Sequence, residues 1–410
     1  MANTLATPSW VTKEVALQYI NEITFVRNVN RTYDDQYVIS GARVGNTVNA
    51  RLPQRFTVTD GQALQQQALY DQTVPITLTN QKNVAFGYSS AQATTELNEI
   101  RTRYVQPGAE AIANACDVLA FNAVYADVYN AVGTPGAGVA TRLQALQAGV
   151  KLTDGSTPLG ERCGVLDPLQ MATLADNTAS LFNPGAVISE NYRKGMFGRQ
   201  QLGVAEWYQD PNRSVHTTGT FTSCTPTVNG ANQTGSTLNT QAWASGATTL
   251  KKGDIISIAG VNGVNPLSYQ DTGRLQQFVV TADTSDSGGN MTALPISPSI
   301  ITSGALQTVT ASPASGAAIY VWSNGATGTL STTTSPTGMI FHSDAFAFVM
   351  ADLIRPGAGA SSETVRSKQW GLAIRMVEQY QIATDQNPSR LDVLVGAATV
   401  QARLAARWQF

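Results

Sequence analysis

Residues 107–132 read PGAEAIANACDVLAFNAVYADVYNAV, and this stretch decides the fold around which the rest of the chain is organised. Pro107 suits the first turn of a helix, and Gly133 begins a stop signal. Apolar residues recur on two opposite faces, and the charges within the stretch are Glu110, Asp117 and Asp127. A helix that is apolar on most faces is covered on most faces. The pattern therefore predicts a long central helix over residues 107–132, covered by its own domain or by other subunits.

The composition argues against a dedicated nucleic-acid-binding protein and suits a surface that makes extensive contact with other protein. A chain of 410 residues is long enough for two or three domains with real cores. Its net charge of -2 argues against a dedicated nucleic-acid-binding face, and its charged fraction of 13% lies well below the usual quarter. The three cysteines, far apart in sequence, indicate neither a disulfide framework nor a zinc cluster. We expect no signal peptide and no membrane span.

The N-terminal region predicts a helix over residues 11–26 and then two strands, 48–52 and 74–78, joined by a glutamine-rich segment. Pro75 makes the second strand an edge strand. A long hairpin with one unpaired edge would be an aggregation liability in a monomer, whereas in an assembly it would be an arm that reaches a neighbour. The sequence pattern does not favour one of these two interpretations over the other. Ser89 and Ser90 can cap a further helix that leads towards the central one.

Beyond the central helix the chain becomes mixed. Helices are expected over residues 143–152 and 167–174, followed by a loop-rich region over 191–210. Between residues 216 and 337 the composition turns to Thr, Ser, Gly and Asn, which predicts a small antiparallel barrel or sandwich inserted into the chain. Its expected strands are 255–259, 277–281, 307–310 and 319–322. Two last strands are expected near residues 372–376 and 391–395.

Residues that would carry chemistry are scarce. His216 and His342 have no metal-binding spacing, and we interpret them as a domain-boundary residue and a packed polar residue. Residues 283–290, DTSDSGGN, look superficially like a calcium loop but lack its downstream Glu, so a polar turn is the preferred interpretation. The sequence therefore nominates no catalytic, cofactor-binding or metal residue and predicts a non-enzyme without cofactors.

Taken in order, the segments resemble the major capsid (coat) proteins of short-tailed double-stranded-DNA bacteriophages of the P-twenty-two type. VTKEVALQYINEI is similar to that family's N-terminal arm helix, and VPITLTNQKNVAFGYSSAQATTEL to its loop and return strand. LKKGDIISIAGVNGVNP, with QFVVTAD after it, resembles the first strands of the family's inserted β domain, and SRLDVLVGAATVQARLAARW its closing strand. The insertion is unusually rich in Ser, Thr and Gly and poor in charge, which departs from the family.

The resemblance implies an α+β, Hong Kong 97-type phage capsid fold with an inserted all-β, barrel-like domain. The implied domains are, by residue range, 1–35 N-terminal arm, 36–88 extended loop (a long β-hairpin), 89–137 peripheral domain with the spine helix, 138–215 first segment of the axial domain, 216–337 inserted β domain, 338–365 second segment of the axial domain, and 366–410 peripheral C-terminal strands.

The function implied by the resemblance is self-assembly into the icosahedral head around packaged double-stranded DNA. Its partners would be copies of itself in hexamers and pentamers, a scaffolding protein, a portal protein and weakly bound DNA, but no membrane. Its location would be the virion, after assembly in the host bacterial cytoplasm. Five cations are candidates for contacts with neighbours or with the lumen, although for any single one a solvated surface is the preferred interpretation: Arg101, Arg103, Arg193, Lys194 and Arg199. The alternatives are an encapsulin-like nanocompartment shell and a β-rich tail or adhesin protein.

Overall fold

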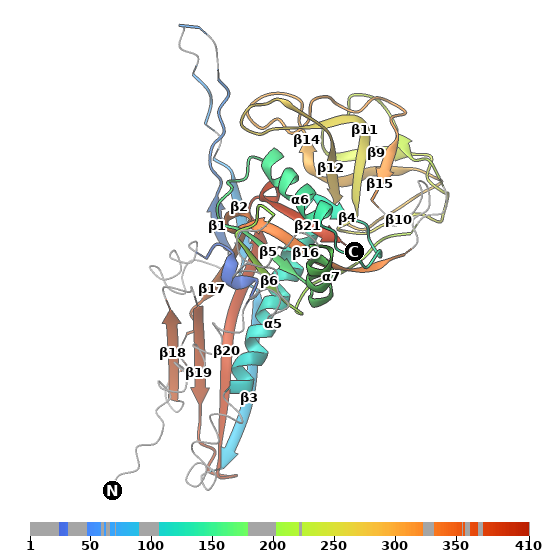
Figure 1. Cartoon of the computed structure of the whole chain (residues 1–410). Coiled ribbons are helices and arrows are strands. Elements are labelled where there is room, and N and C mark those ends of the chain that lie inside the picture. The colour runs from blue at the N-terminus through green and yellow to red at the C-terminus, as the bar shows by residue number, and fades with distance from the viewer. Residues whose placement is uncertain are drawn as a thin grey trace. The chain divides into compact units, whose positions relative to one another are not determined.

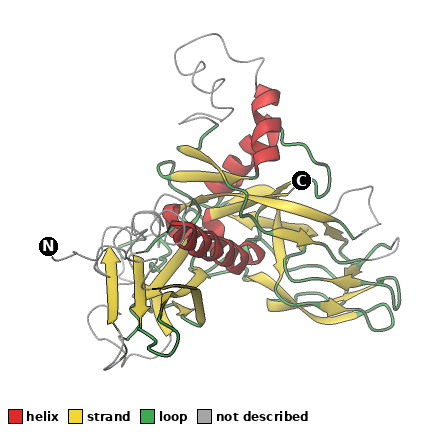
Figure 2. Cartoon of the chain, turned by 90° about the horizontal axis from the view of Figure 1, so that it is seen from below, coloured by secondary structure: helices red, strands yellow, loops and turns green. Residues whose placement is uncertain are grey.

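The computed structural model describes residues 24–31, 47–58, 61–62, 66–69, 71–89, 106–178, 202–220, 224–322, 332–354, 356, 361–367 and 372–409. The chain divides into two compact units, which Figure 1 colours along the sequence. The first contains Met1–Arg51, Thr73–Ala123 and Phe346–Val400, and the second contains Leu52–Gln72, Val124–Ala345 and Gln401–Phe410. Figure 2 shows strands, in yellow, as the dominant element of the described chain.

The first unit contains a five-stranded sheet built around one long strand, β20, and a separate two-stranded sheet. Its strands are β1 (Thr47–Arg51), β2 (Thr73–Thr77), β3 (Asn80–Ser89), β17 (Phe346–Ala351), β18 (Ser361–Ser367), β19 (Leu372–Glu378) and β20 (Gln386–Thr399). β20 pairs antiparallel with β3, with β19 and with β17, and β18 pairs with β19. β1 and β2 form an antiparallel pair with Val48 opposite Ile76. The strands predicted at 48–52, 74–78, 372–376 and 391–395 are therefore confirmed.

Helix α5 (Gln106–Val124) packs on this sheet. A Cβ added at Gly108 would lie 3.5 Å from Val84 of β3 and 3.6 Å from Leu391 of β20, so the first turn of the helix lies against both strands. Asp117, which is 1% exposed, accepts hydrogen bonds from the backbone N–H groups of residues 24, 25 and 26 at 2.8–3.2 Å. This carboxylate ties the segment that contains the short 3-10 helix η1 (Val26–Asn28) to α5.

The central helix is shorter than the sequence predicts, because it ends at Val124 and not at residue 132. The chain tightens into the 3-10 helix η5 (Tyr125–Asp127), becomes extended at Val128, and forms strand β4 (Ala131–Gly133). The apolar residues that continued the helical pattern are buried in a sheet, where Ala131 and Val132 pair with β21. Strand pairing therefore prevails over a helix propensity that Val, Tyr and Asn weaken.

Gly133 shows why this strand needs a glycine at its end. Its φ of +92° lies in the left-handed region, and a Cβ there would lie 2.0 Å from the carbonyl oxygen of Gln409. The residue that the sequence nominates as the stop signal of a helix is in fact where two backbones approach closely.

The second unit contains a mixed sheet with helices on one face. The strand order is β4–β21–β16–β5–β6, with β7 paired to one end of β16. The elements after β4 are α6 (Arg142–Asp154), β5 (Arg162–Leu166), α7 (Pro168–Thr178), β6 (Glu206–Gln209), β7 (Val215–Thr217), β16 (Thr334–His342), η7 (Ser343–Ala345), η8 (Ala402–Leu404) and β21 (Ala405–Gln409). Ala145 and Ala148 of α6, with Met171 of α7, are buried in one cluster with Trp207 and Trp408 from the sheet. The helices predicted at 143–152 and 167–174 are confirmed.

The sequence between β7 and β16 forms a second sheet with its own core. Its strands are β8 (Thr227–Val228), β9 (Gly235–Gln241), β11 (Ile255–Val264), β12 (Asp271–Val280), β14 (Met291–Ile300) and β15 (Ile319–Val321), in the order β15–β11–β12–β14–β9–β8; β10 (Thr249–Leu250) pairs with β13 (Thr284–Ser285). Val228 N–H donates to Ala317 O and Ile319 N–H to Pro226 O, both at 2.9 Å, so hydrogen bonds join the two edges of the sheet. This set of elements, over residues 224–322, is called the inserted domain below, after the insertion that the sequence predicts over residues 216–337.

Three of the four strands predicted in this region are confirmed, and the fourth is wrong. Residues 307–310 contain an isolated bridge between Gly263 and Val309 but form no strand. Gln307 N–H instead closes a turn on Gly304 O at 3.1 Å. The alternating polarity that predicted a strand at residues 307–310 arises because one side chain of this loop, Val309, is buried. The helix predicted at 11–26 lies outside the described residues except for its last three, and the one expected after Ser90 lies outside them up to residue 105.

Candidate functional site

The two histidines lie in different settings. His216 is 2% exposed, and its Nε2 lies 2.9 Å from Oδ1 of Asp254, which is 3% exposed. The other oxygen of Asp254 accepts the N–H groups of Gly219 and Lys251 at 3.0 and 2.8 Å. The imidazole is thus enclosed where β7 leads into the inserted domain. His342 is 6% exposed, and its Nδ1 accepts the Asp344 N–H at 3.3 Å.

A buried polar seam joins the sheet of the second unit to the inserted domain. Besides the pair of His216 and Asp254, it contains Arg407 of β21, whose Nη2 donates to the Gly253 carbonyl at 2.6 Å. Burial lowers the pKa of Arg407 to about 10, and the nearby carboxylate of Asp254 opposes that shift. Lys252 and Asp127 form an ion pair of 3.4 Å at the exposed end of the seam. A His–Asp pair closed off in this way can fix a domain boundary, but it presents no imidazole nitrogen to a substrate.

Gln277 of β12 completes the seam. Its side-chain Oε1 accepts the Ala131 N–H at 2.9 Å, and its Nε2 donates to the Ala131 carbonyl at 3.2 Å. β4 is the edge strand of its sheet, so the amide of Gln277 takes the place of a neighbouring strand. Ala131, Ile255 and Val279 form a small apolar cluster beside it. Sequence reasoning missed this contact; the signal was a glutamine directly before the apolar run Phe278–Val280.

The segment that looks like a calcium loop is a polar turn. Asp286 accepts backbone N–H groups of Gly246, Thr248 and Gly289 at 2.8, 3.0 and 3.0 Å. These bonds lower the pKa of the Asp286 carboxyl group, with the bond from Gly246 contributing most. Its carboxylate is therefore used to hold the turn between β13 and β14. Within the described residues, no group of three or more His, Cys, Asp or Glu side chains has metal-binding geometry.

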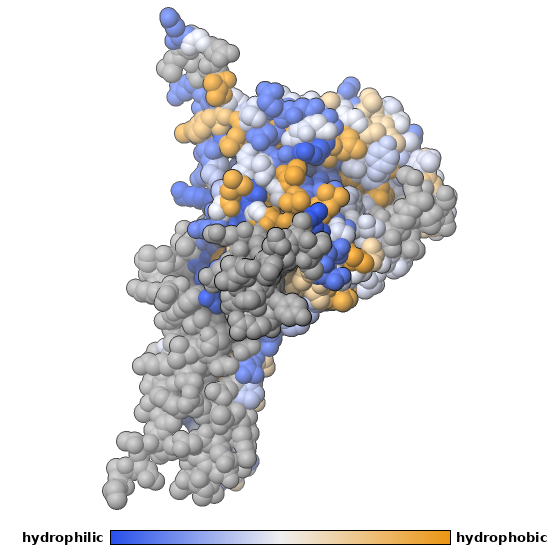
Figure 3. All heavy atoms as spheres, viewed as in Figure 1, coloured by the Kyte–Doolittle hydropathy of each residue, from blue (hydrophilic) through white to orange (hydrophobic). Residues whose placement is uncertain are grey.

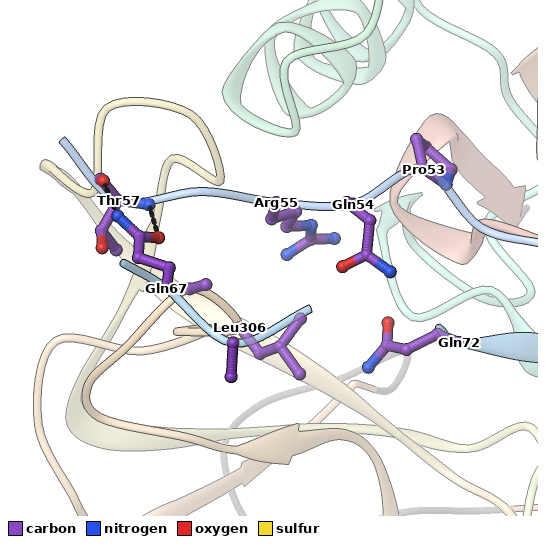
Figure 4. Close-up of a pocket in the computed structure, with 9 residues that line it drawn as sticks. Pro53, Gln54, Arg55, Thr57, Gln67, Gln72 and Leu306 are labelled. Carbon is purple, nitrogen blue, oxygen red and sulfur yellow. Dashed lines mark hydrogen bonds between the residues drawn. The ribbon is translucent and has the colours of Figure 1, made fainter. Parts of the chain in front are cut away.

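A pocket opens beside the glutamine-rich loop, residues 52–72. Thr57 N–H donates to Gln67 Oε1 at 3.0 Å and Gln67 Nε2 donates to Thr57 O, so one side chain bridges the two arms of the loop (Figure 4). Tyr269 of the inserted domain donates from its hydroxyl towards Phe56 O at 3.2 Å. The pocket measures about 260 Å³ and is lined by Pro53, Gln54, Arg55, Thr57, Gln67, Ala68, Gln72, Ala305 and Leu306.

The chemistry of this pocket is that of a polar contact surface. Figure 4 shows Gln54, Arg55 and Gln72 reaching into the space between the two arms of the loop. Burial and then the charge of Arg55 lower the pKa of Arg403, so two guanidinium groups lie near each other. The lining of the pocket includes neither a carboxylate nor a histidine or cysteine. The pocket can accept polar or anionic groups, but it has no pair of residues for general acid–base catalysis.

Large apolar side chains are exposed on the same unit. On the glutamine-rich loop these are Phe56, Val58 and Leu69, which are 57%, 94% and 73% exposed. On α6 they are Leu143, Leu146 and Val150. The five cations expected to make contacts, Arg101, Arg103, Arg193, Lys194 and Arg199, lie outside the described residues.

Comparison with known proteins identifies the class to which these features belong. The family model described as P22 coat protein, gene protein 5, matches residues 10–406. The chain belongs to the P22 coat protein family. A comparison with curated proteins finds no match.

Solved structures similar to this P22-family coat protein include several phage capsids. Mycobacterium phage Che8 is 13% identical over 94% of this chain and 90% of its own, with a TM-score of 0.43. The bacteriophage PhiM1 mature capsid is 9% identical over 94% and 86%, also with a TM-score of 0.43. The CUS-3 coat protein I-domain is 28% identical over 24% of this chain and 94% of its own, with a TM-score of 0.18.

Membership of this family establishes the role of the chain. It is a major capsid protein, a structural protein that assembles with copies of itself to form a phage head. The polar seam, the asparagine- and threonine-rich insertion and the exposed apolar side chains are therefore to be understood as features of a shell subunit. No helix in the described ranges is both long and apolar enough to cross a membrane.

Proposed function

We propose that this coat protein closes an icosahedral head around double-stranded DNA, in hexamers and pentamers, with a scaffolding and a portal protein as assembly partners. The observation that carries the proposal is the family match over residues 10–406, which spans both compact units. A net charge of -2 supports it, because a wall that bound DNA strongly would hinder packaging and release. Assembly would take place in the host bacterial cytoplasm.

The subunit fold proposed is the Hong Kong 97-type fold with an inserted barrel. The hydrogen bonds of Val228 and Ile319 that join the edges of the six-stranded sheet support a closed barrel. β5 and β16 support the insertion, because they pair with Phe341 opposite Cys163 although the whole inserted domain lies between them in sequence. Residues 138–215 and 338–345 would then be the two segments of one axial domain. Residues 346–365, which the sequence groups with them, belong by contacts to the first unit.

The remaining domain assignments are proposed on the same basis. The first unit groups α5 with β17–β20, which supports a peripheral domain with α5 as its spine helix. Residues 401–410 belong by contacts to the second unit, although the sequence groups them with residues 366–400. We therefore propose that the peripheral domain ends near Val400 and that β21 contributes to the axial domain.

The inserted domain would stiffen the subunit. Gln277, Arg407 and the His216–Asp254 pair bind it to β4, β21 and β7 through buried hydrogen bonds. Buried polar contacts of this kind have directional geometry and fix one arrangement of two packed elements. A domain that is fixed on its subunit can set the angle between neighbours, and hence the size of the shell.

Electron microscopy of the purified protein, expressed alone and together with the genes that flank its own, tests the proposal. Closed icosahedral shells of uniform diameter are expected in the co-expressed sample. Shells that contain no second protein under every condition would favour a nanocompartment, which needs no scaffolding partner. Monodisperse monomers or small oligomers in both samples would overturn the proposal.

A further inference from the structure

Helix α6 exposes large apolar side chains on one face and buries mainly small ones on the other, unlike an ordinary amphipathic surface helix. The buried face, which contacts the sheet, presents two small side chains, Ala145 and Ala148, and at its C-terminal end one leucine, Leu152; all three are fully buried. The opposite face presents Leu143, Leu146 and Val150, which are 63%, 43% and 40% exposed. An ordinary surface helix places its large apolar residues towards the core and its polar residues towards water.

These exposed residues form one continuous stripe. Their spacing of three and four positions places them on one side of the helix, one turn above another. Val139, four residues before Leu143 and 47% exposed, prolongs the stripe in sequence. In Figure 3 apolar residues, in orange, gather on the surface of the second unit where Figure 1 draws α6. This set, Val139, Leu143, Leu146 and Val150, is called the α6 stripe.

Charge and area restrict what can cover the α6 stripe. Residues 143–150 read LQALQAGV and contain no charged side chain, and Arg142 and Lys151 flank them in sequence. The four aliphatic side chains of the stripe themselves offer no hydrogen-bond donor or charge to a phosphate backbone or to an acidic peptide. Four half-exposed aliphatic side chains amount to an apolar patch of at most a few hundred Å². A stable pair of proteins needs roughly 800 Å² on each partner, so the stripe alone cannot hold a dimer together. It suits one of many weak contacts that act together in a closed assembly.

We propose that the α6 stripe is a contact between subunits, covered in the assembled head by a second copy of this chain. The inference rests on the proposed shell and names one of the surfaces that builds it. A second copy is the partner that a coat protein always meets, at the high local concentration of a shell. In a ring of identical subunits each contact joins two different surfaces, so the stripe faces another region of the next copy and not its own counterpart.

The α6 contact is tested by Leu146→Asp in the full chain, with Leu267→Asp as the matched control. Leu267 is 73% exposed in a turn of the inserted domain, so the same charge is added to water-exposed leucines in both variants. Both free subunits should melt within about 2 °C of the unchanged chain, because substitutions at exposed positions have small effects. Sedimentation and electron microscopy should show the yield of shells reduced at least about tenfold by Leu146→Asp and unchanged by Leu267→Asp.

Thiol labelling of Leu146→Cys by N-ethylmaleimide, followed by peptide mass spectrometry, identifies what covers the stripe. The introduced thiol should react in free subunits and be protected at least about tenfold in emptied shells of coat protein alone. Protection that is lost when the scaffolding protein leaves would overturn the proposal in favour of that partner. Equal labelling of free and assembled protein, or shells from Leu146→Asp in undiminished yield, would overturn it as well. Failure of the unchanged chain to form shells would instead reject the proposed function together with this contact.

Discussion

Replacing Gln277 by leucine should loosen the inserted domain from the sheet that carries it. The substitution keeps the approximate size of the side chain and removes both hydrogen bonds to Ala131, of 2.9 and 3.2 Å. Because Ala131 is fully buried on an edge strand, no water can replace the lost amide. One donor and one acceptor of the backbone would remain unsatisfied in the interior.

The magnitude follows from these two groups. Each unsatisfied buried group costs about 1–3 kcal/mol, and the new leucine side chain regains some of this by burying apolar surface. The expected loss is about 2–3 kcal/mol in the free energy of unfolding, which lowers the melting temperature by roughly 5–10 °C for a unit of this size. Local opening should increase too, so the amide of Ala131 should exchange its hydrogen about 30-fold faster or more.

Calorimetry and amide hydrogen exchange measure the two effects. Gln270→Leu is the control, because Gln270 precedes the same strand and is exposed. If Gln277→Leu changes the free energy of unfolding by less than about 0.5 kcal/mol, as an exposed substitution does, the idea that its amide substitutes for a strand is refuted.

Three further predictions concern other buried groups. Asp117→Ala removes the acceptor of three backbone N–H groups and should lower the free energy of unfolding by about 3 kcal/mol, with faster amide hydrogen exchange at residues 24–26. Asp117→Asn should lower it less, because the asparagine side chain keeps one acceptor oxygen. Burial lowers the pKa of Lys151 from 10.5 to about 8, so at this residue the unfolded state binds more protons between these values. Denaturation should therefore show the stability of the unchanged chain, relative to that of Lys151→Met, rising from pH 8 to pH 10.5; a constant difference would contradict this. Burial, with the negative charges of Glu206 and Glu161, raises the pKa of the Cys163 thiol to about 11. Because the thiolate is the reactive form, iodoacetamide at pH 8 should modify Cys163 about 100-fold more slowly in the folded protein than in the urea-unfolded chain. Similar rates in the two states would contradict this.

Local pattern predicted most elements of this fold. Runs with alternating polarity became strands β1, β2, β19 and β20, and helical spacing correctly marked α6 and α7. The failure at the end of the central helix has a physical cause: Ala131 and Val132 are apolar and buried, as a core helix requires, but they are buried by pairing with β21, almost 280 residues away in sequence. The periodicity of apolar residues indicates which residues are buried, but not which segment of the chain buries them.

The surfaces that carry function were harder to predict. Helical spacing located α6, but two faces of that helix are apolar, and only packing decided that the alanine face lies inside. The position of Gln277 directly before an apolar run is a weak signal, because a polar residue in a strand is ordinarily solvent-exposed. Its partner Ala131 belonged to a predicted helix, so the sequence did not bring the two residues together. The sequence could place His216 at a change in composition, and its role at a domain boundary stays a prediction.

The position of β21 also has a consequence for synthesis. Residues 405–409 lie between β4 and β16, so both earlier strands lack a neighbour until the ribosome has released this late segment. A nascent or prematurely terminated chain would expose two unpaired strand edges and leave the pocket of Trp408 empty. The seam would also lack Arg407. The sheet of the second unit can therefore be completed only after translation has passed residue 409.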